Sequence, residues 1–268
     1  MSSGASGEGE RHEFVTLESE PMYMGGILAL RRDRVAMPGG GSATREVVEH
    51  YGAVAVAAVD EVGRVALVHQ YRHPLGHRLW ELPAGLLDIA GEDTQLAAAR
   101  ELQEEAGVEA TTWRVLVDAA ASPGFTDEVV RVFLATGLSH PGRGESHDEE
   151  ADMTVHWVPL AEAVSMVLAG EIVNAVAAAG ILAAHVALTG HHTRASDAPW
   201  PDRGAELAAL LLAVEAVVGP QAGQLGTQVV LGALVHRGDD VDGALVGGAS
   251  LVVDDFAGIC RYKEHAGQ

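Results

Sequence analysis

One short segment of this sequence predicts a helix and also contains capping residues for both of its ends. Residues 96–106 are rich in Ala, Leu, Glu and Gln, which favour helical backbone. Asp93 or Thr94 is available as the N-cap, and Gly107 lies just beyond the last helical residue. The sequence therefore predicts a helix with defined boundaries between strand-like segments.

Three glutamates on this helix are candidate ligands for a metal ion. Glu101, Glu104 and Glu105 are spaced i, i+3 and i+4, so their side chains can converge on one face. Carboxylates held together repel one another unless water or cations separate them, and carboxylate oxygens suit Mg²⁺ or Mn²⁺. By themselves, the same glutamates also fit an ordinary solvated acidic face. The spacing alone therefore leaves both a divalent-metal site and an acidic surface open.

The charge balance excludes several kinds of partner. The chain carries 17 Lys and Arg residues against 38 Asp and Glu residues, a net charge of −21 with His neutral. A surface this acidic repels nucleic acid and anionic membranes, so neither is expected as a partner. It also repels phosphate esters, so a phosphorylated substrate would need metal ions or local arginines to neutralise it.

Nothing in the sequence predicts membrane insertion or export. The longest apolar stretch, residues 175–188, is shorter than the roughly 20 residues that a membrane helix needs. The first residues are polar and lack the apolar core of a signal peptide. A single cysteine, Cys260, rules out an intrachain disulfide framework. We therefore expect a cytoplasmic protein.

The order of the expected elements indicates an α+β or α/β/α layered domain. The segments 54–59 and 64–71 suggest a hairpin, because Val, Ala and Leu alternate around a Gly-containing turn. Residues 1–12 are expected to be a flexible tail, 13–190 the main domain, and 191–268 an extension of uncertain structure and role. The other expected strands are 14–20, 27–35, 113–117, 129–136 and 154–158, and the other expected helices are 160–168, 174–188 and 205–218.

The residues around the acidic helix resemble a known motif. Residues 100–108, RELQEEAGV, match the REUxEExGU core of the Nudix hydrolases, in which U is a bulky aliphatic residue. Glu92 stands eight positions before Arg100, as the first motif glutamate of that family does. The motif glycine is Gly85 rather than residue 86, so the loop before the helix is one residue longer and the carboxylate spacing is unchanged. We expect Glu92 and Arg100 to form a structural ion pair between loop and helix.

Flanking segments narrow the resemblance to the ADP-ribose pyrophosphatases, and most closely to the actinobacterial ones. They are residues 82–85 (LPAG), 70–72 (QYR) and 122–128 (SPGFTDE), and the likeness runs from about His12 to Gly190. It implies a Nudix α/β/α sandwich with an N-terminal β-strand region and a homodimer formed through that region. The implied reaction is metal-dependent hydrolysis of the ADP-ribose pyrophosphate bond to AMP and ribose 5-phosphate, with Mg²⁺ or Mn²⁺ as cofactor.

The resemblance also implies the residues that handle the metal. Glu101, Glu105 and the backbone carbonyl of Ala84 would be the ligands, with Glu104 as a lesser ligand nearby. A catalytic base is expected in the acidic loop 146–152. In the register of the family it would be Glu150, with Glu149 as the second candidate.

Five further residues match positions that contact substrate in the family. Arg72 would meet the phosphates or the ribose, since a guanidinium suits that task. Ser122 and Glu128 belong to a turn that approaches the substrate. Arg45 and Glu46 match residues that reach the partner's site in dimers with exchanged N-terminal strands.

Two alternative functions stay open. One is a Nudix hydrolase acting on another nucleoside diphosphate derivative, such as an oxidised guanine nucleotide or a nucleotide sugar. The other is a non-catalytic Nudix domain that senses a ligand, with the C-terminal extension as its effector. Loss of the motif carboxylates would favour the second, and all of them are present.

Overall fold

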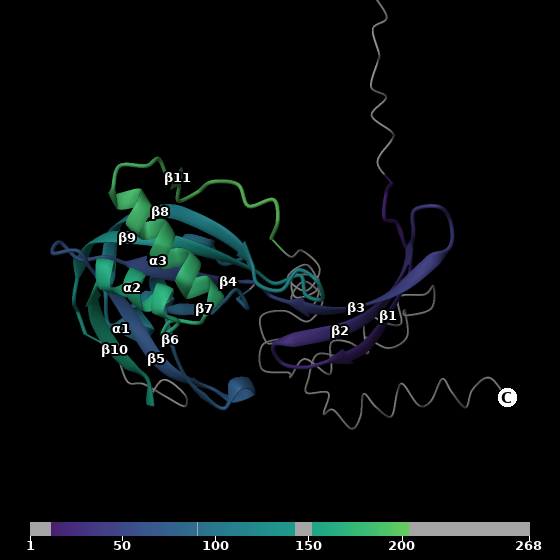
Figure 1. The fold of residues 1–268 in the computed structure, drawn as a ribbon, viewed down its shortest axis with the longest axis horizontal. Helices are drawn as coiled ribbons and strands as arrows, with labels where there is room; N and C mark the ends of the chain where they lie inside the picture. The colour runs from purple at the N-terminus through teal and green to yellow at the C-terminus, as the bar shows by residue number, and fades with distance from the viewer. Residues whose placement is uncertain (1–11, 90, 143–151, 204–268) are drawn as a thin grey trace, which may run out of the picture. The chain divides into compact units, whose positions relative to one another are not determined.

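The computed structural model describes residues 12–89, 91–142 and 152–203, which divide into two units that meet in sequence at residue 50 (Figure 1). The expected tail, most of the acidic loop and the expected helix 205–218 lie outside the described residues. The first unit holds β1 (Thr16–Met24), β2 (Leu28–Ala36) and β3 (Ser42–His50). They form one sheet in the order β1-β2-β3.

The described residues of the first unit form little core of their own. Among its described residues, only Met24, Ala29 and Asp33 are buried. Ion pairs between Arg32 and Glu20 and between other charged side chains cross the antiparallel β1–β2 pair. Apolar side chains remain exposed on the segments that flank and form β1, namely Phe14, Val15, Leu17, Met22, Tyr23 and Ile27. A small sheet with so little buried surface needs a further packing partner to be stable.

The second unit is a layered domain with two sheets. The five-stranded sheet has the order β11-β8-β9-β4-β7, and the three-stranded sheet has the order β10-β5-β6. Within the first of these sheets β4 and β9 are parallel, and the other pairs are antiparallel. Its elements are β4 (Ala53–Ala58), β5 (Arg64–Arg72), β6 (His77–Glu81), β7 (Ala84–Leu86), α1 (Thr94–Ala106), β8 (Glu109–Ala120), β9 (Val129–Ser139), β10 (Thr154–Pro159), α2 (Leu160–Ala169), α3 (Ala175–Leu188) and β11 (Arg194–Ala195).

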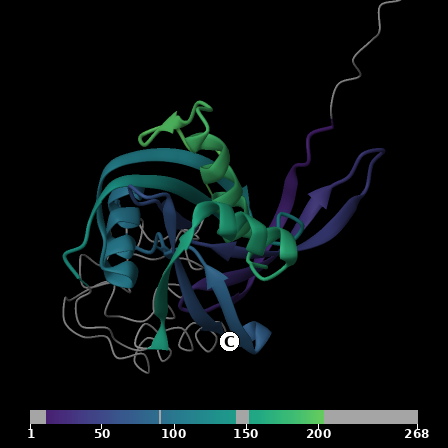
Figure 2. The same cartoon turned by 60° about the vertical axis from the view of Figure 1, so that its left-hand side comes forward.

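Strand β4 lies at the centre of this domain and is buried along its whole length. Its residues 53, 55 and 57 face a core completed by α2 and α3, while 54, 56 and 58 face a second core completed by α1. Helices therefore cover both faces of the sheet (Figure 2). This arrangement is the α/β/α sandwich that the sequence predicts, in an α+β chain.

The predicted hairpin between 54–59 and 64–71 is wrong. β4 pairs with β9 and β7, whereas β5 pairs with β10 and β6, so the two strands belong to different sheets. A turn does join them, and a single bridge links Val59 to Val65. The alternation of Ala with Val in β4 reflects two apolar faces that are both covered, which is typical of a central strand rather than of a half-exposed hairpin.

The helix boundaries were predicted from capping residues, and the structure contains these caps. The Asp93 side chain accepts hydrogen bonds from two backbone N–H groups at the start of α1, and Gly107 ends the helix with a φ of 67°. In α3 the Asn174 side chain accepts from the N–H of Ala177. None of the helices in the described part of the chain is long and apolar enough to span a membrane.

Helix α3 approaches the sheet closely because of one glycine. A Cβ at Gly180 would lie 2.6 Å from Cδ1 of Leu82 and 2.9 Å from Cγ1 of Val132. Glycine costs a helix about 1 kcal/mol relative to alanine, and here it allows direct packing on the strand residues. Leu82 thereby becomes a fully buried residue immediately before the turn to Ala84.

The segment after α3 packs on the same domain. Arg131 of β9 donates to Asp118 of β8 at 2.7 Å and to backbone carbonyls of residues 198–199, and its guanidinium lies 4.6 Å from the Trp200 ring centroid. Arg194 also donates to Asp118, at 2.6 Å. The described segment beyond the expected boundary at 190 is thus attached to β8 and β9.

Candidate active site

The acidic helix and the turn before β7 meet at Glu105. Its carboxylate Oε2 accepts a hydrogen bond from the backbone N–H of Ala84 at 2.9 Å, across 21 residues of chain. The side chain is buried. Glu105 therefore fixes the position of α1 relative to the residue whose carbonyl is a predicted metal ligand.

Glu101 lies one turn earlier on α1, against Gly85. A Cβ at position 85 would come within 1.9 Å of the Glu101 Cδ, so only glycine leaves room for this carboxylate. Burial raises the pKa of the Glu101 carboxyl, the neighbouring Arg100 opposes that rise, and the charges of Glu104 and Asp88 add to it. The Glu101 side chain is partly buried, and a carboxylate in such an acidic surrounding is stabilised by a nearby cation.

Arg100 pairs with three of the motif carboxylates. It donates to Glu92 with distances of 3.2 and 3.1 Å, to Glu101 at 2.7 Å and to Glu104 at 3.1 Å. The hydrogen bond to Glu92 is the largest cause of its raised pKa. The expected ion pair between Glu92 and Arg100 is present, and it links the longer loop to α1.

The residues around Ala84 fit a divalent cation with oxygen ligands. Glu105 places a buried carboxylate and Glu101 a partly buried one on successive turns of α1, both directed at the same backbone turn. Within the described part of the chain, no three His, Cys, Asp or Glu side chains are grouped as a metal site. Mg²⁺ does not need three, because it commonly binds one or two protein carboxylates together with water and substrate phosphates.

Arg72 lies at the end of β5 and forms a bidentate ion pair with Glu81 at the end of β6. Its Nε donates to Oε1 at 2.9 Å and its Nη2 to Oε2 at 2.7 Å. Glu81 lies between Trp80 and Leu82, and no local pattern in the sequence indicates its role, because its partner is on another strand. The buried carboxylate of Glu81 therefore orients the Arg72 guanidinium, which is not an isolated surface charge.

The turn with Ser122 and Glu128 forms as expected. The Ser122 carbonyl accepts from the N–H groups of Phe125 and Thr126. Oε1 of Glu128 lies 3.7 Å from Nδ1 of His50, and Asp127 accepts from the His50 backbone N–H. His50 is a neighbour of this turn that no local pattern in the sequence indicates.

The described structure does not test the remaining four predicted residues. Arg45 and Glu46 lie on β3 in the first unit, both exposed, and Arg45 donates to the carbonyl of the preceding Thr44. Glu149 and Glu150 lie outside the described residues. The roles of these four residues stay predictions.

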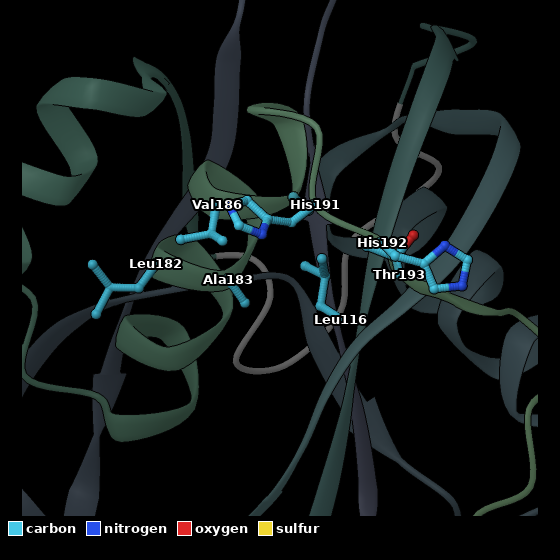
Figure 3. Close-up of a pocket in the computed structure, with 8 residues that line it drawn as sticks. Leu116, Leu182, Ala183, Val186, His191, His192 and Thr193 are labelled. Atoms are coloured by element: carbon cyan, nitrogen blue, oxygen red, sulfur yellow. The ribbon is translucent and has the colours of Figure 1, made fainter.

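A separate cavity of about 330 Å³ lies between α3 and β8 (Figure 3). None of the predicted site residues lines it. Figure 3 shows His191 beside Val186 of α3, and His192 with Thr193 on the opposite side. The lining residues are Leu116, Leu182, Ala183, Val186, Ala187, His191, His192 and Thr193.

Comparisons with known proteins agree with the motif. The NUDIX domain family matches residues 49–177. The chain is 59% identical over 199 residues to the ADP-ribose pyrophosphatase of Mycobacterium tuberculosis, covering 74% of this chain and 96% of that protein. It is 38% identical over 160 residues to the ADP-ribose pyrophosphatase of Bacillus subtilis, covering 60% and 86%. The fold is similar to the crystal structure of an ADP compounds hydrolase, with a TM-score of 0.59 and 20% identity over 68% of this chain and 97% of that one.

Proposed function

Because the chain belongs to the Nudix family, we propose that it hydrolyses the pyrophosphate bond of ADP-ribose, giving AMP and ribose 5-phosphate. The observation that carries this proposal is the meeting of Glu101 and Glu105 with the turn at Ala84 and Gly85. Nudix hydrolases generally need a divalent metal, and we propose Mg²⁺ or Mn²⁺ for this chain. The identity to two ADP-ribose pyrophosphatases supports the choice of substrate.

Glu101, Glu105 and the Ala84 carbonyl would hold the metal, with Glu104 contributing less directly. When bound, such a cation neutralises the pyrophosphate and polarises its phosphorus. Glu105 keeps α1 and the Ala84 turn in register, and Gly85 leaves the space that the Glu101 carboxylate fills. Arg100 limits the mutual repulsion of Glu92, Glu101 and Glu104 by donating to all three.

The attacking water needs a base that α1 does not supply. We propose Glu150 for this role, with Glu149 as the second candidate. A carboxylate on a loop can orient water beside the phosphorus without crowding the metal ligands. Glu150→Gln should lower kcat by about a hundredfold or more, and Glu149→Gln should lower it much less. The reverse order would assign the base to Glu149.

Arg72, Ser122 and Glu128 are proposed to bind the substrate. The guanidinium of Arg72 suits phosphate oxygens, since it presents several donors in one plane. The turn at Ser122 and Glu128 offers a hydroxyl and a carboxylate, which suit ribose hydroxyl groups.

We further propose a homodimer formed through the first unit, with Arg45 and Glu46 reaching the site of the partner subunit. The support is the sheet β1-β2-β3, which buries few residues of its own and exposes several large apolar ones. A second copy of the chain would cover that surface. Arg45 and Glu46 are exposed on β3, where a second copy could meet them.

The test is a product assay with ADP-ribose and Mg²⁺ or Mn²⁺. AMP and ribose 5-phosphate should form, and should disappear both with EDTA and in the Glu105→Gln variant. A well-folded Glu105→Gln protein with full activity would refute the metal assignment. A parallel panel of an oxidised guanine nucleotide and a nucleotide sugar covers the alternative substrates. No cleavage of any of them by a folded protein would favour the ligand-sensing alternative.

A further inference from the structure

The ion pair between Arg72 and Glu81 connects a proposed substrate residue to the turn that carries Ala84. We infer that Glu81 is a positioning residue, which fixes the guanidinium of Arg72 in the orientation that meets a substrate phosphate. The inference rests on the proposed function, because the phosphate contact of Arg72 is part of it.

The strand register shows that Arg72 is folded back to reach Glu81. In the β5–β6 pair, Glu81 stands opposite Val68, and Arg72 stands opposite His77. Residues 68, 70 and 72 share one face of β5, because side chains alternate along a strand. The Arg72 side chain therefore runs back along β5 over four positions instead of extending past the strand end.

The side chains of Glu81 and Arg72 differ in burial, and this indicates different roles. The Glu81 side chain is only 4% exposed, whereas that of Arg72 is 41% exposed. A carboxylate this buried is unfavourable unless it is paired, and Arg72 pairs with it through two N–H groups. The amide of Gln70 adds a weaker contact at 3.4 Å. Removing one partner of such a pair leaves the other charge unpaired, and the intact bidentate pair also sets the direction of the exposed guanidinium.

Glu81 is also joined rigidly to the candidate metal ligands. It lies three residues before Ala84, whose N–H binds Glu105. Between them, Leu82 is fully buried and the carbonyl of Pro83 accepts from the N–H of Val56 at 2.8 Å. Glu81 binds the Nε and Nη2 edge of Arg72. The guanidinium of Arg72 is therefore held at a place set by the same turn as the candidate metal ligands.

A double-mutant cycle tests this inference. The proteins are the wild type, Glu81→Gln, Arg72→Met and the double variant, all as the full chain. Glu81→Gln should raise KM for ADP-ribose about tenfold or more and change kcat much less, because it misdirects a group used in binding. If Glu81 acts through Arg72, the double variant should match Arg72→Met within about twofold. Independent effects would instead multiply, and that result would overturn the inference.

The control is Arg64→Met, at the opposite end of the same strand. Arg64 also pairs with an acidic residue, Asp60, at 2.7 Å, but far along β5 from Glu81. KM should be unchanged in this variant. If Glu81→Gln lowers the Tm, the shorter carboxylate of Glu81→Asp repeats the test with the charge retained. A wild-type KM in both folded Glu81 variants would refute the positioning role.

Calorimetric titration of ADP-ribose in EDTA separates this inference from the proposed reaction. It measures Kd without turnover, and Glu81→Gln should weaken Kd in parallel with its effect on KM. A wild-type protein that binds ADP-ribose in EDTA but does not cleave it when Mg²⁺ or Mn²⁺ is supplied would contradict the proposed reaction only. A wild-type Kd in the Glu81→Gln variant, with cleavage intact, would contradict the positioning role only.

Discussion

The carboxylate of Glu101 occupies the space that any side chain at Gly85 would need. The distance from a Cβ at position 85 to Cδ of Glu101 would be 1.9 Å, far inside van der Waals contact. The glycine that precedes the acidic helix is therefore required by a close approach and not by a special φ angle. This contact relates the LPAG segment to the motif glutamates through space.

Gly85→Ala should inactivate the enzyme without unfolding it. The added methyl group must displace the Glu101 carboxylate from the turn, so kcat with ADP-ribose and Mg²⁺ should fall by about a hundredfold or more. The readout is steady-state kinetics alongside the Tm. Gly26→Ala is the matched control, because a Cβ there has no neighbour within 4 Å. Full activity in Gly85→Ala would show that Glu101 does not need its present position.

Asp118 should make a pH-dependent contribution to stability. Burial acts to raise the pKa of its carboxyl, but the hydrogen bonds and charges of Arg131 and Arg194 outweigh burial and lower that pKa. A carboxyl with a lowered folded-state pKa stabilises the protein above the unfolded pKa of about 3.9. That stabilisation is lost as the pH falls through the folded-state pKa.

Asp118→Asn should therefore lower the free energy of unfolding by about 3 kcal/mol at pH 7. The difference from the wild type should shrink as the pH falls below about 4. Urea unfolding between pH 7 and pH 3 measures both effects, with Asp197→Asn as the control, because Asp197 is exposed in the segment after α3. A difference that stays constant with pH would mean that the Asp118 charge does not stabilise the fold.

Local signals in the sequence are sufficient to predict the three described helices, α1, α2 and α3. Asp93 and Gly107 bound α1 because capping depends on residues within one turn of the helix end. The sandwich architecture was also predicted. The strand pairing of β4 and β5 was not, since the choice of a neighbouring strand depends on contacts far apart in the sequence.

In the candidate site, too, the local features could be predicted from the sequence and the contacts between distant residues could not. The spacing of Glu101 and Glu105 places both on one helix face, and this is a local property of α1. The hydrogen bond from Ala84 to Glu105 and the ion pair from Arg72 to Glu81 join residues that only the fold brings together. Glu81 was missed because a single acidic residue in an apolar run has no local partner that reveals its role.

The segment after α3 should be part of the stable domain as far as Arg203. Its attachment depends on buried Arg131, whose guanidinium packs on Trp200. A chain ending after Gly190 should have a Tm about 10 °C below that of a chain ending after Arg203, because it leaves Arg131 partly unpaired. Trp200→Ala in the full chain should lower stability by about 2 kcal/mol. Equal Tm values for the two truncated chains would place the domain boundary at residue 190, as the sequence predicts.

The proposed exchange of residues between subunits predicts complementation in mixed dimers. Arg45→Ala and Glu105→Gln should each be poorly active alone, because every site in either homodimer lacks one needed group. In a mixed dimer, the site of the Arg45→Ala subunit keeps its own Glu105 and receives Arg45 from the other subunit. Refolding the two variants together should therefore restore activity in that site, measured with ADP-ribose and Mg²⁺. Analytical ultracentrifugation of the wild type shows whether the dimer exists, and dimers that mix without regaining activity would mean that Arg45 serves its own subunit.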